Sequence, residues 1–398
     1  MPRSADLVVI GGGIVGLALA DAWLTRTPAD RVIVVDKEPA LAAHASGRNS
    51  GVLHAGFYYA PDSLKARLTR QGNALLHEFC REQGVAVRET GKVVVAQSAD
   101  QLPALLELQR RGTANGVDVE LIDEQQLREL EPLARTHEQA LWSPTTGVAD
   151  PAAVVEALAR RVRAKGGEVL LGSTVTGAGP RWVMTTSDGL ISAGHIINAA
   201  GLHADVIAHW FGVGTEYRML PFKGLYWYGS WAPGRLQRHV YPVPDARNPF
   251  LGVHLTVTVD GRAKIGPTAI PALWREDYGG LGGWKAQDTW EIARTFPRFL
   301  ASDAHDVPGL IRSELPKYSR KHLVRQAAAL VPSVRVEDFV TKGRVGVRAQ
   351  LFHLPTRTLE MDFVVRPGQD STHILNAVSP GWTSALAFAD YVIDAVMA

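Results

Sequence analysis

Three glycines near the start of the chain have the spacing that lets a backbone turn approach a phosphate group. They are Gly11, Gly13 and Gly16, and an acidic residue, Asp36, follows twenty residues after the last of them. Gly11 permits a tight turn, Gly13 removes a Cβ where phosphate must approach, and Gly16 allows a helix to pack closely. Asp36 is placed to accept hydrogen bonds from ribose hydroxyls. The chemistry that this set predicts is the binding of a dinucleotide.

A strand, a helix and a second strand are needed to position these residues. Residues 7–10 read as a buried parallel strand, residues 17–24 as the helix, and residues 31–35 as a second strand that ends at Asp36. The first amides of the helix would face a pyrophosphate. Because the same motif serves both NAD and FAD, the identity of the ligand depends on other parts of the chain.

A second strand-to-helix turn lies at Ala200 and Gly201, after the apolar residues of the stretch 195–199. Taken alone, this turn is either an ordinary connection or a second approach of the backbone to the dinucleotide. The N-terminal motif favours the second interpretation. A pairing of two such separated turns is typical of flavoproteins.

The composition is that of a globular chain long enough for two domains: 398 residues, 46% hydrophobic and 21% charged, with a formal net charge of +2. The single cysteine, Cys80, excludes an intrachain disulfide and a cysteine-ligated metal centre, and it makes the reducing cytoplasm the expected compartment. Interspersed charges argue against a nucleic-acid partner. No stretch approaches the length of a membrane span, although a weak contact with the inner face of a membrane stays compatible with the composition. No metal site is predicted.

The order of elements predicts an α/β protein in two parts. The first is a Rossmann-like dinucleotide-binding domain built from the discontinuous segments 1–85, 145–212 and 342–398. The second is a mixed-sheet α+β substrate domain formed by residues 86–144 and 213–341. Helices are predicted over residues 64–84, 101–115, 123–130 and 150–165.

Aromatic residues and prolines punctuate the chain from Gly212 to about Thr341, which predicts a sheet of short strands able to cover a site. Examples of these strands are residues 225–228, 239–244 and 250–256. Polar residues that interrupt this region carry more information than its aromatic ones. They are His254, Lys223 and, where the chain leaves the region, Arg348.

Six stretches carry a family resemblance that spans essentially the whole chain. They are Ser46-Gly-Arg-Asn-Ser-Gly-Val-Leu-His-Ala-Gly-Phe-Tyr-Tyr59, Ser63-Leu-Lys-Ala-Arg67, Tyr241-Pro-Val-Pro-Asp245, Pro249-Phe-Leu-Gly-Val-His-Leu-Thr256, Gly266-Pro-Thr-Ala269 and Gly346-Val-Arg-Ala-Gln350. With them the chain resembles the FAD-dependent D-amino-acid oxidase superfamily, and within it the L-2-hydroxyglutarate oxidase/dehydrogenase group. The resemblance implies FAD extended across the first domain, with its isoalloxazine ring at the boundary with the second.

The resemblance and the N-terminal motif together predict the FAD-binding residues. The loop 376–385 opens the last helix, and its amides would point at the N1 and O2 edge of the flavin, where reduced flavin is negatively charged. Thr383 and Ser384 are expected there as flavin contacts or as simple helix caps. The full predicted set is Gly11, Gly13, Ile14, Val15, Gly16, Asp36, Lys37, Ser46, Arg48, Asn49, Ser50, Gly51, Val52, Val175, Ala200, Gly201, Ser379, Gly381, Trp382, Thr383 and Ser384.

The reaction implied by the resemblance is the oxidation of a carbon that bears a hydroxyl next to a carboxylate, with hydride transfer to flavin N5. Arg348 is expected to hold the carboxylate, because its guanidinium is a planar fork. His54 and His254 compete as the base for the hydroxyl proton, and the other would then be a carboxylate ligand. Either could instead be a buried histidine that bonds a backbone carbonyl. Lys223 and Tyr241 complete the predicted substrate contacts, whereas His44, His195 and His203 are expected to be structural.

Two departures from the pattern of the group bear on the substrate. Phe222-Lys-Gly-Leu225 stands where the group has Phe-Arg-Gly and an acid, and Ser379-Pro-Gly-Trp-Thr-Ser384 stands where it has Ser-Pro-Ala-Ala-Thr-Ser. Lysine does not replace arginine at a bidentate site, and Trp382 adds bulk near the flavin edge. L-2-hydroxyglutarate, oxidised to 2-oxoglutarate, is the leading substrate, with another 2-hydroxy acid or an amino acid as the alternative.

Three classes of function are left open by the sequence. The first is a 2-hydroxy-acid oxidase or dehydrogenase, and the second is an amine or amino-acid oxidase of the same fold, which needs no base for a neutral amine. The third is a flavoprotein without turnover that serves as a partner or electron carrier. The electron acceptor also stays open between oxygen, a membrane quinone and a soluble carrier, as do histidyl attachment of the FAD and the oligomeric state.

Overall fold

The N-terminal strand, helix and strand form where the sequence predicts them. The computed structural model describes residues 3–245, 248, 250–304 and 306–398, so that Pro249 of the resembling stretches lies outside the described residues. Strand β1 (Arg3–Ile10) leads into helix α1 (Ile14–Arg26), and strand β2 (Val32–Val35) follows. All four residues of β2 are buried, as expected of a parallel strand covered on both faces.

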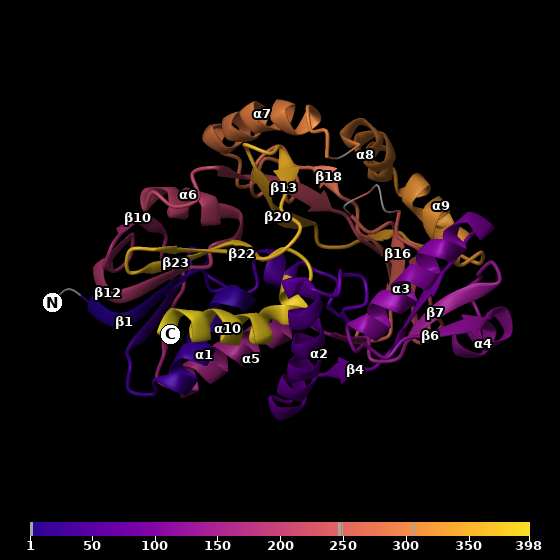
Figure 1. Cartoon of the computed structure of the whole chain (residues 1–398), viewed down its shortest axis with the longest axis horizontal. Coiled ribbons are helices and arrows are strands. Elements are labelled where there is room, and N and C mark those ends of the chain that lie inside the picture. The colour runs from indigo at the N-terminus through magenta and orange to yellow at the C-terminus, as the bar shows by residue number, and fades with distance from the viewer. Residues whose placement is uncertain (1–2, 246–247, 249, 305) are drawn as a thin grey trace.

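Strand β1 lies inside an eight-stranded sheet whose central strands are parallel. Their order is β23, β12, β1, β2 and β9, so segments far apart in the sequence lie side by side (Figure 1). Three antiparallel strands extend the sheet. The bounds are β9 (Glu168–Leu170), β10 (Val175–Gly179), β11 (Trp182–Thr185), β12 (Gly189–Asn198), β22 (Val364–Gly368) and β23 (Ser371–Asn376).

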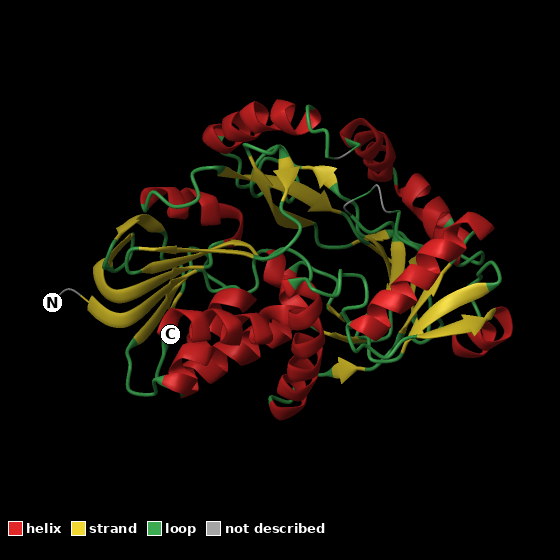
Figure 2. Cartoon of the chain, in the orientation of Figure 1, coloured by secondary structure: helices red, strands yellow, loops and turns green. Residues whose placement is uncertain are grey.

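Helices α1, α5 (Pro151–Ala164) and α10 (Gly381–Met397) lie on one face of this sheet, among the red helices of Figure 2, and their apolar side chains belong to one hydrophobic core. Helix α2 (Leu64–Glu82) passes so close to α10 at Gly72 that a Cβ there would lie 2.4 Å from the Thr383 carbonyl oxygen. Helix α6 (Ala204–Trp210) packs on the opposite face through Ile207. None of the described helices is both long and apolar enough to cross a bilayer.

The remaining strands form three further sheets. One has eight strands in the order β19 (Thr341–Lys342), β14 (Trp227–Tyr228), β17 (Ala263–Gly266), β16 (His254–Val257), β15 (His239–Pro242), β5 (Lys92–Val95), β7 (Gln139–Ser143) and β6 (Glu120–Asp123). The second has the order β18 (Ile270–Pro271), β13 (Tyr217–Gly224), β20 (Gly346–His353) and β21 (Thr358–Leu359). The third joins β3 (Val52–Leu53), β8 (Gly147–Ala149) and β4 (Val87–Arg88). These sheets confirm the predicted α/β class, whereas the domain boundaries stay a prediction.

Within its α+β substrate domain the sequence analysis names only strands between 212 and 341, and it does not locate the helices of this region. Residues 286–330 instead form three helices, α7 (Ala286–Leu300), α8 (Val307–Glu314) and α9 (Arg320–Leu330). In α7, Ile292, Thr295 and Phe299 lie on one buried face at helical spacing. The centre of the Phe299 ring lies 6.1 Å from the centre of the Phe222 ring. The helical spacing of these buried residues was overlooked because aromatic strands dominate the sequence pattern before them. The other helices are α3 (Leu102–Ala114) and α4 (Glu124–Leu130), and the 3₁₀ turns are 45–47, 99–101, 201–203, 315–318 and 336–338.

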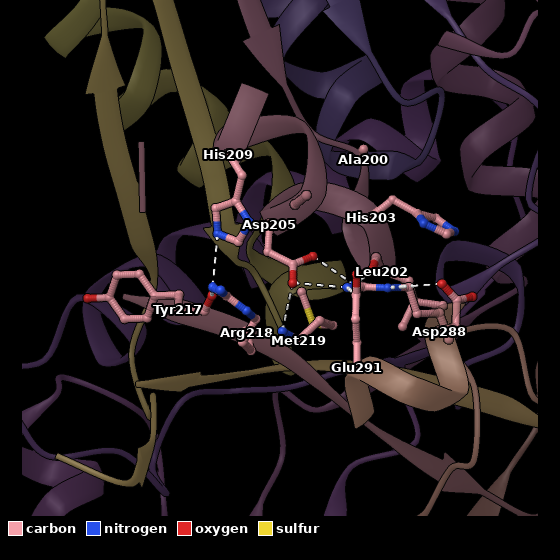
Figure 3. Close-up of polar contacts among 12 residues, drawn as sticks. Ala200, Leu202, His203, Asp205, His209, Tyr217, Arg218, Met219, Asp288 and Glu291 are labelled. Atoms are coloured by element: carbon pink, nitrogen blue, oxygen red, sulfur yellow. Dashed lines mark hydrogen bonds and ion pairs between the residues drawn. The ribbon is translucent and has the colours of Figure 1, made fainter. Parts of the chain in front are cut away.

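A buried ion cluster joins α6 to the second part of the molecule (Figure 3). Asp205 of α6 accepts a hydrogen bond from the Met219 amide at 2.9 Å and pairs with the Arg275 guanidinium at 2.7 Å. Arg275, only 2% exposed, also bonds Glu291 of α7 at 2.9 Å. Because Asp205 is 1% exposed, both charges of the Asp205–Arg275 pair are removed from water, and each charge is stabilised mainly by the other.

Replacing Asp205 by asparagine should therefore destabilise the protein by about 3 kcal/mol, since a buried guanidinium loses its main counter-charge. Urea unfolding, followed by circular dichroism, measures the loss. The matched control is Asp260→Asn, which breaks a pair with Arg262 that is half exposed and should cost less than about 1 kcal/mol. Equal losses in the two variants would contradict the structural role given to Asp205.

Candidate active site

One large cavity runs between the parallel sheet and the sheets of the second part. Its volume is about 980 Å³, at the upper end of the range of small-molecule and cofactor sites. The glycine turn after β1 lines one end of the cavity. Residues from β16, β20 and the first turn of α10 line other parts of its wall. The fold thus brings together four parts of the chain that the sequence analysis singled out separately.

The glycine turn has the geometry of a phosphate cradle. Gly11 has a φ of +111°, and a Cβ there would lie 2.5 Å from the Ala199 carbonyl oxygen. A Cβ on Gly16 would lie 1.9 Å from the Gly11 carbonyl oxygen, so the helix can start only with glycine at that position. Asp36 Oδ2 accepts a hydrogen bond from the Gly12 amide at 2.7 Å, which leaves further lone pairs for a ligand hydroxyl. These contacts match those expected for a dinucleotide.

Most of the residues predicted for the site line this cavity, and four do not. Gly16 and Gly51 serve close backbone packing instead, since a Cβ on Gly51 would lie 2.3 Å from the Ala149 carbonyl oxygen. Ser384 is buried 3.3 Å from the Thr69 hydroxyl. Lys223 is the fourth. The predicted residues that line the cavity are Gly11, Gly13, Ile14, Val15, Asp36, Lys37, Ser46, Arg48, Asn49, Ser50, Val52, His54, Val175, Ala200, Gly201, Tyr241, His254, Arg348, Ser379, Gly381, Trp382 and Thr383.

Lys223 is held away from the cavity by an ion pair. Its ammonium lies 2.6 Å from Asp277, which is 2% exposed. Leu225 removes the acid that the resembling group has close by in the sequence, and Asp277 supplies the counter-charge from a different segment. The structure therefore does not bring the Lys223 side chain to the predicted substrate contacts.

His254 is a buried, neutral imidazole with one nitrogen committed. Its Nδ1 lies 2.8 Å from the Gly252 carbonyl oxygen, and since a carbonyl only accepts, Nδ1 carries the proton. The ring stacks on Tyr241 at 3.7 Å. Burial lowers the pKa of His254 to about 3, and the nearby cations Lys92 and Arg348 act in the same direction. Its Nε2 is thus a hydrogen-bond acceptor at neutral pH.

His54 has the opposite arrangement. Its Nδ1 lies 3.4 Å from the Lys92 nitrogen, and while Lys92 is protonated that nitrogen only donates, which places the ring proton on Nε2. Burial lowers the pKa of His54 well below its ordinary value. Lys92 itself is fully buried over the Tyr241 ring, and burial lowers its pKa to about 7. The Thr383 hydroxyl accepts the His54 backbone amide at 3.2 Å and donates to the Val52 carbonyl oxygen at 3.1 Å, which fixes His54 to the start of α10.

Arg348 presents an uncompensated guanidinium to the same cavity. It lies on β20 opposite Phe222, and its guanidinium stands 5.2 Å from the Phe250 ring. Burial lowers the pKa of Arg348, and Tyr226, the more distant Glu314 carboxylate and Tyr59 oppose that effect. Among the described residues, no carboxylate lies within ion-pair distance of Arg348. Because Arg348 lacks a protein counter-charge among the described residues and two buried, neutral imidazoles line the same cavity, the cavity can bind a carboxylate and accept a proton.

The sequence analysis missed several residues of the cavity wall. His44 and His203, expected to be structural, both line it; His44 Nδ1 lies 2.7 Å from the Tyr278 hydroxyl and His203 Nε2 2.9 Å from Glu276. Both histidines directly flank loops that the sequence analysis had already placed at the cofactor, and this proximity in sequence could have identified them as residues of the cavity wall. Glu38, His44 and Glu276 come close enough to ligate a metal, but the Lys37 ammonium bonds both carboxylates. Lys65, Tyr59 and Tyr226 also line the cavity.

Comparison with known proteins agrees with this geometry. A family model described as FAD dependent oxidoreductase matches residues 6–395. The L-2-hydroxyglutarate dehydrogenase of Salmonella houtenae is 35% identical over 400 residues, covering 99% of this chain and 93% of that protein. The mitochondrial L-2-hydroxyglutarate dehydrogenase of Bos taurus is 34% identical over 418 residues, covering 99% and 89%.

Solved structures with the same fold are more distant in sequence. The L-alpha-glycerophosphate oxidase of Mycoplasma pneumoniae with FAD bound superposes with a TM-score of 0.79 at 21% identity, covering 100% of this chain and 95% of that one. The glycine oxidase of Geobacillus kaustophilus gives a TM-score of 0.72 at 18% identity, with coverage of 99% and 95%. The predicted combination of a dinucleotide-binding part and a substrate-binding part is confirmed by these folds.

Proposed function

The chain belongs to the family of FAD-dependent oxidoreductases, and on that premise we propose that it oxidises a small 2-hydroxy acid, with L-2-hydroxyglutarate as the best candidate. One observation carries the proposal. His54, His254 and Arg348, which lie far apart in the sequence, line one cavity with the glycine turn, and no protein carboxylate among the described residues pairs with Arg348. The names of the two curated relatives support the choice of the five-carbon acid.

The residues of the glycine turn fit FAD. The Gly11 and Gly16 positions leave no space for a Cβ, and Asp36 stands where ribose hydroxyls would lie. The first turn of α10 lines the same cavity, so its free amides would face the flavin edge that becomes negative on reduction. When bound, FAD supplies an electron acceptor that takes a hydride at N5.

Arg348 would bind the carboxylate next to the reacting carbon. A guanidinium fork fixes both carboxylate oxygens, and this orients the neighbouring hydroxyl and hydrogen in the cavity. His254 Nε2 would accept the hydroxyl proton, because its own proton is held on Nδ1 by the Gly252 carbonyl. His54 would donate from Nε2 to a substrate oxygen, with Lys92 fixing that tautomer. The sequence did not decide which of the two histidines is the base. The hydrogen-bond acceptor beside His254 Nδ1 and the donor beside His54 Nδ1 support the roles proposed above.

The proposed roles leave the electron acceptor open between oxygen, a quinone and a soluble carrier. The reducing cytoplasm stays the expected compartment on the ground of the single cysteine, Cys80, which is buried in α2.

Anaerobic absorbance spectroscopy of the purified protein tests the proposed function. L-2-hydroxyglutarate should bleach the flavin band, whereas D-2-hydroxyglutarate should leave it unchanged, because hydride transfer requires one face of the substrate over N5. Other 2-hydroxy acids and a panel of amino acids are tested separately as alternative substrates. Bleaching by an amino acid alone would establish the amine-oxidase alternative. A flavin that no acid or amine reduces would favour a protein without turnover.

A further inference from the structure

Lys65 is a buried lysine that lines the same cavity as Arg348. It lies in the first turn of α2 and is 5% exposed. In the described part of the chain, its ammonium has neither a hydrogen-bond acceptor nor a carboxylate within ion-pair distance. Taking an ammonium out of water without a partner is costly, and a bound anionic ligand is one way to supply the missing counter-charge.

The Asp362 carboxylate acts on the charge of Lys65, but its oxygens already accept three backbone hydrogen bonds. Asp362 accepts the Leu64 amide on Oδ2 at 3.0 Å, and on Oδ1 it accepts the amides of Lys65 and Phe363 at 3.1 and 2.8 Å. It therefore caps the start of α2 with its carboxylate. Its charge raises the pKa of Lys65, but burial dominates and lowers that pKa to about 8. The backbone holds Asp362 in place, and the lysine ammonium is left for another anion.

Lys65 and Arg348 are close enough for their charges to interact. The guanidinium of Arg348 lowers the pKa of Lys65, as expected of two like charges in a poorly solvated space. Tyr59 and Tyr226 interact with Arg348 and line the same cavity as both cations, and their hydroxyls are neutral because burial raises their pKa values. A ligand with one carboxylate can neutralise one of the two cations. A ligand with two carboxylates can neutralise both.

We propose that Lys65 binds the second carboxylate of a dicarboxylic substrate whose first carboxylate is held by Arg348, and so selects dicarboxylates over monocarboxylates. This assignment rests on the proposed function, because it takes the Arg348 end of the cavity as the place of the reacting carbon. It also explains how a chain with Lys223 sequestered by Asp277 can retain a cation for the far end of its substrate.

A binding experiment separates the role of Lys65 from catalysis. Glutarate and pentanoate have five carbons each and differ in the second carboxylate, and both lack the hydroxyl that is oxidised. Titrated into the FAD-loaded protein and followed by calorimetry, glutarate should bind at least about tenfold more tightly than pentanoate. In Lys65→Met this preference should disappear, with pentanoate affinity changed less than about threefold. Lys65→Arg should keep the preference, because the positive charge is retained.

The matched control is Lys285→Met, which removes an exposed lysine from the wall of the same cavity and should leave the preference unchanged. An equal loss of preference in that variant would mean that total charge, and not Lys65, selects the ligand, and the proposal would fail. It would fail too if Lys65→Met weakened both acids equally or altered the flavin spectrum without ligand, since Lys65 would then support the fold or the flavin.

Kinetics with hydroxy acids distinguish this failure from a failure of the proposed function. If the wild-type protein oxidises L-2-hydroxyglutarate and L-2-hydroxypentanoate, Lys65→Met should lower kcat/KM for the first by about 30-fold or more and leave the second within about threefold. Oxidation of L-2-hydroxyglutarate with an unchanged ratio in the variant would overturn the role of Lys65 alone. Preferential glutarate binding that depends on Lys65, without oxidation of any hydroxy acid, would overturn the proposed function and retain the dicarboxylate site.

Discussion

Replacing His254 by glutamine should slow anaerobic reduction of the flavin by L-2-hydroxyglutarate by about 10²- to 10⁴-fold. Glutamine has a similar volume and polarity, but it cannot take up a proton at Nε2. Stopped-flow absorbance measures the limiting reduction rate directly, and this separates chemistry from later electron transfer. His54→Gln is the matched comparison, since it should raise KM more than it lowers the limiting rate. A reversed pattern would exchange the roles of the two histidines.

The pH dependence of the wild-type protein gives a second view of His254. Burial lowers the pKa of this imidazole to about 3, so the neutral form, which is the active base, persists as the pH falls. Between pH 8 and pH 5, kcat/KM should show no loss from protonation of the base. An ordinary histidine would become protonated near pH 6.5 and lose activity below that value. An acid limb centred near pH 6.5 that persists in Lys92→Met would exclude His254 as the base, whereas a limb lost in that variant would belong to Lys92, whose pKa burial lowers to about 7.

Replacing Arg348 by methionine should reduce kcat/KM for a 2-hydroxy acid by about 10²- to 10³-fold, because the buried carboxylate loses a charge-assisted, bidentate partner. Methionine retains much of the length and the apolar contact with the Phe250 ring. Arg348→Lys should recover only part of the activity, since an ammonium cannot form the planar fork. Steady-state kinetics with an artificial electron acceptor provide the measurement.

The control for Arg348 lies four residues earlier on the same segment. Arg344 is exposed, and Arg344→Met removes the same charge without reaching the cavity wall. Its kinetic constants should match those of the wild-type protein within about twofold. Unchanged kinetics in Arg348→Met would remove that residue from the site, while similar losses in both variants would point to a general effect of charge.

Local patterns predicted the cofactor end of this molecule well. The glycine turn, β1, α1 and β2 follow from the spacing of a few residues within one short segment, and the helix predicted over 150–165 is observed as α5, with the Asp150 side chain as its cap before a proline. The predicted helix over 64–84 is observed as α2, Leu64–Glu82. In each of these cases the determining contacts lie close together in the sequence.

Other features depend on contacts between distant segments, and the sequence did not reveal them. Asp277 supplies the counter-charge for Lys223, although Asp277 lies fifty-four positions further along the chain. The helices between 286 and 330 are amphipathic, but the aromatic strands before them dominated the pattern. Lys65 lay within a stretch that resembled the family, yet only the structure shows that its ammonium has no partner among the described residues while Asp362 caps the helix.

The order in which the chain is synthesised matters for a cavity closed by its own C-terminal helix. The Thr383 hydroxyl ties the start of α10 to Val52 and His54, and β23 completes the row of parallel strands beside β12. A nascent chain on the ribosome thus makes its glycine turn early but lacks this wall, and the apolar face that α1 and α5 share with α10 stays uncovered. The complete wall of the cavity therefore forms only once residues 381–397 have been synthesised and have packed against α1 and α5.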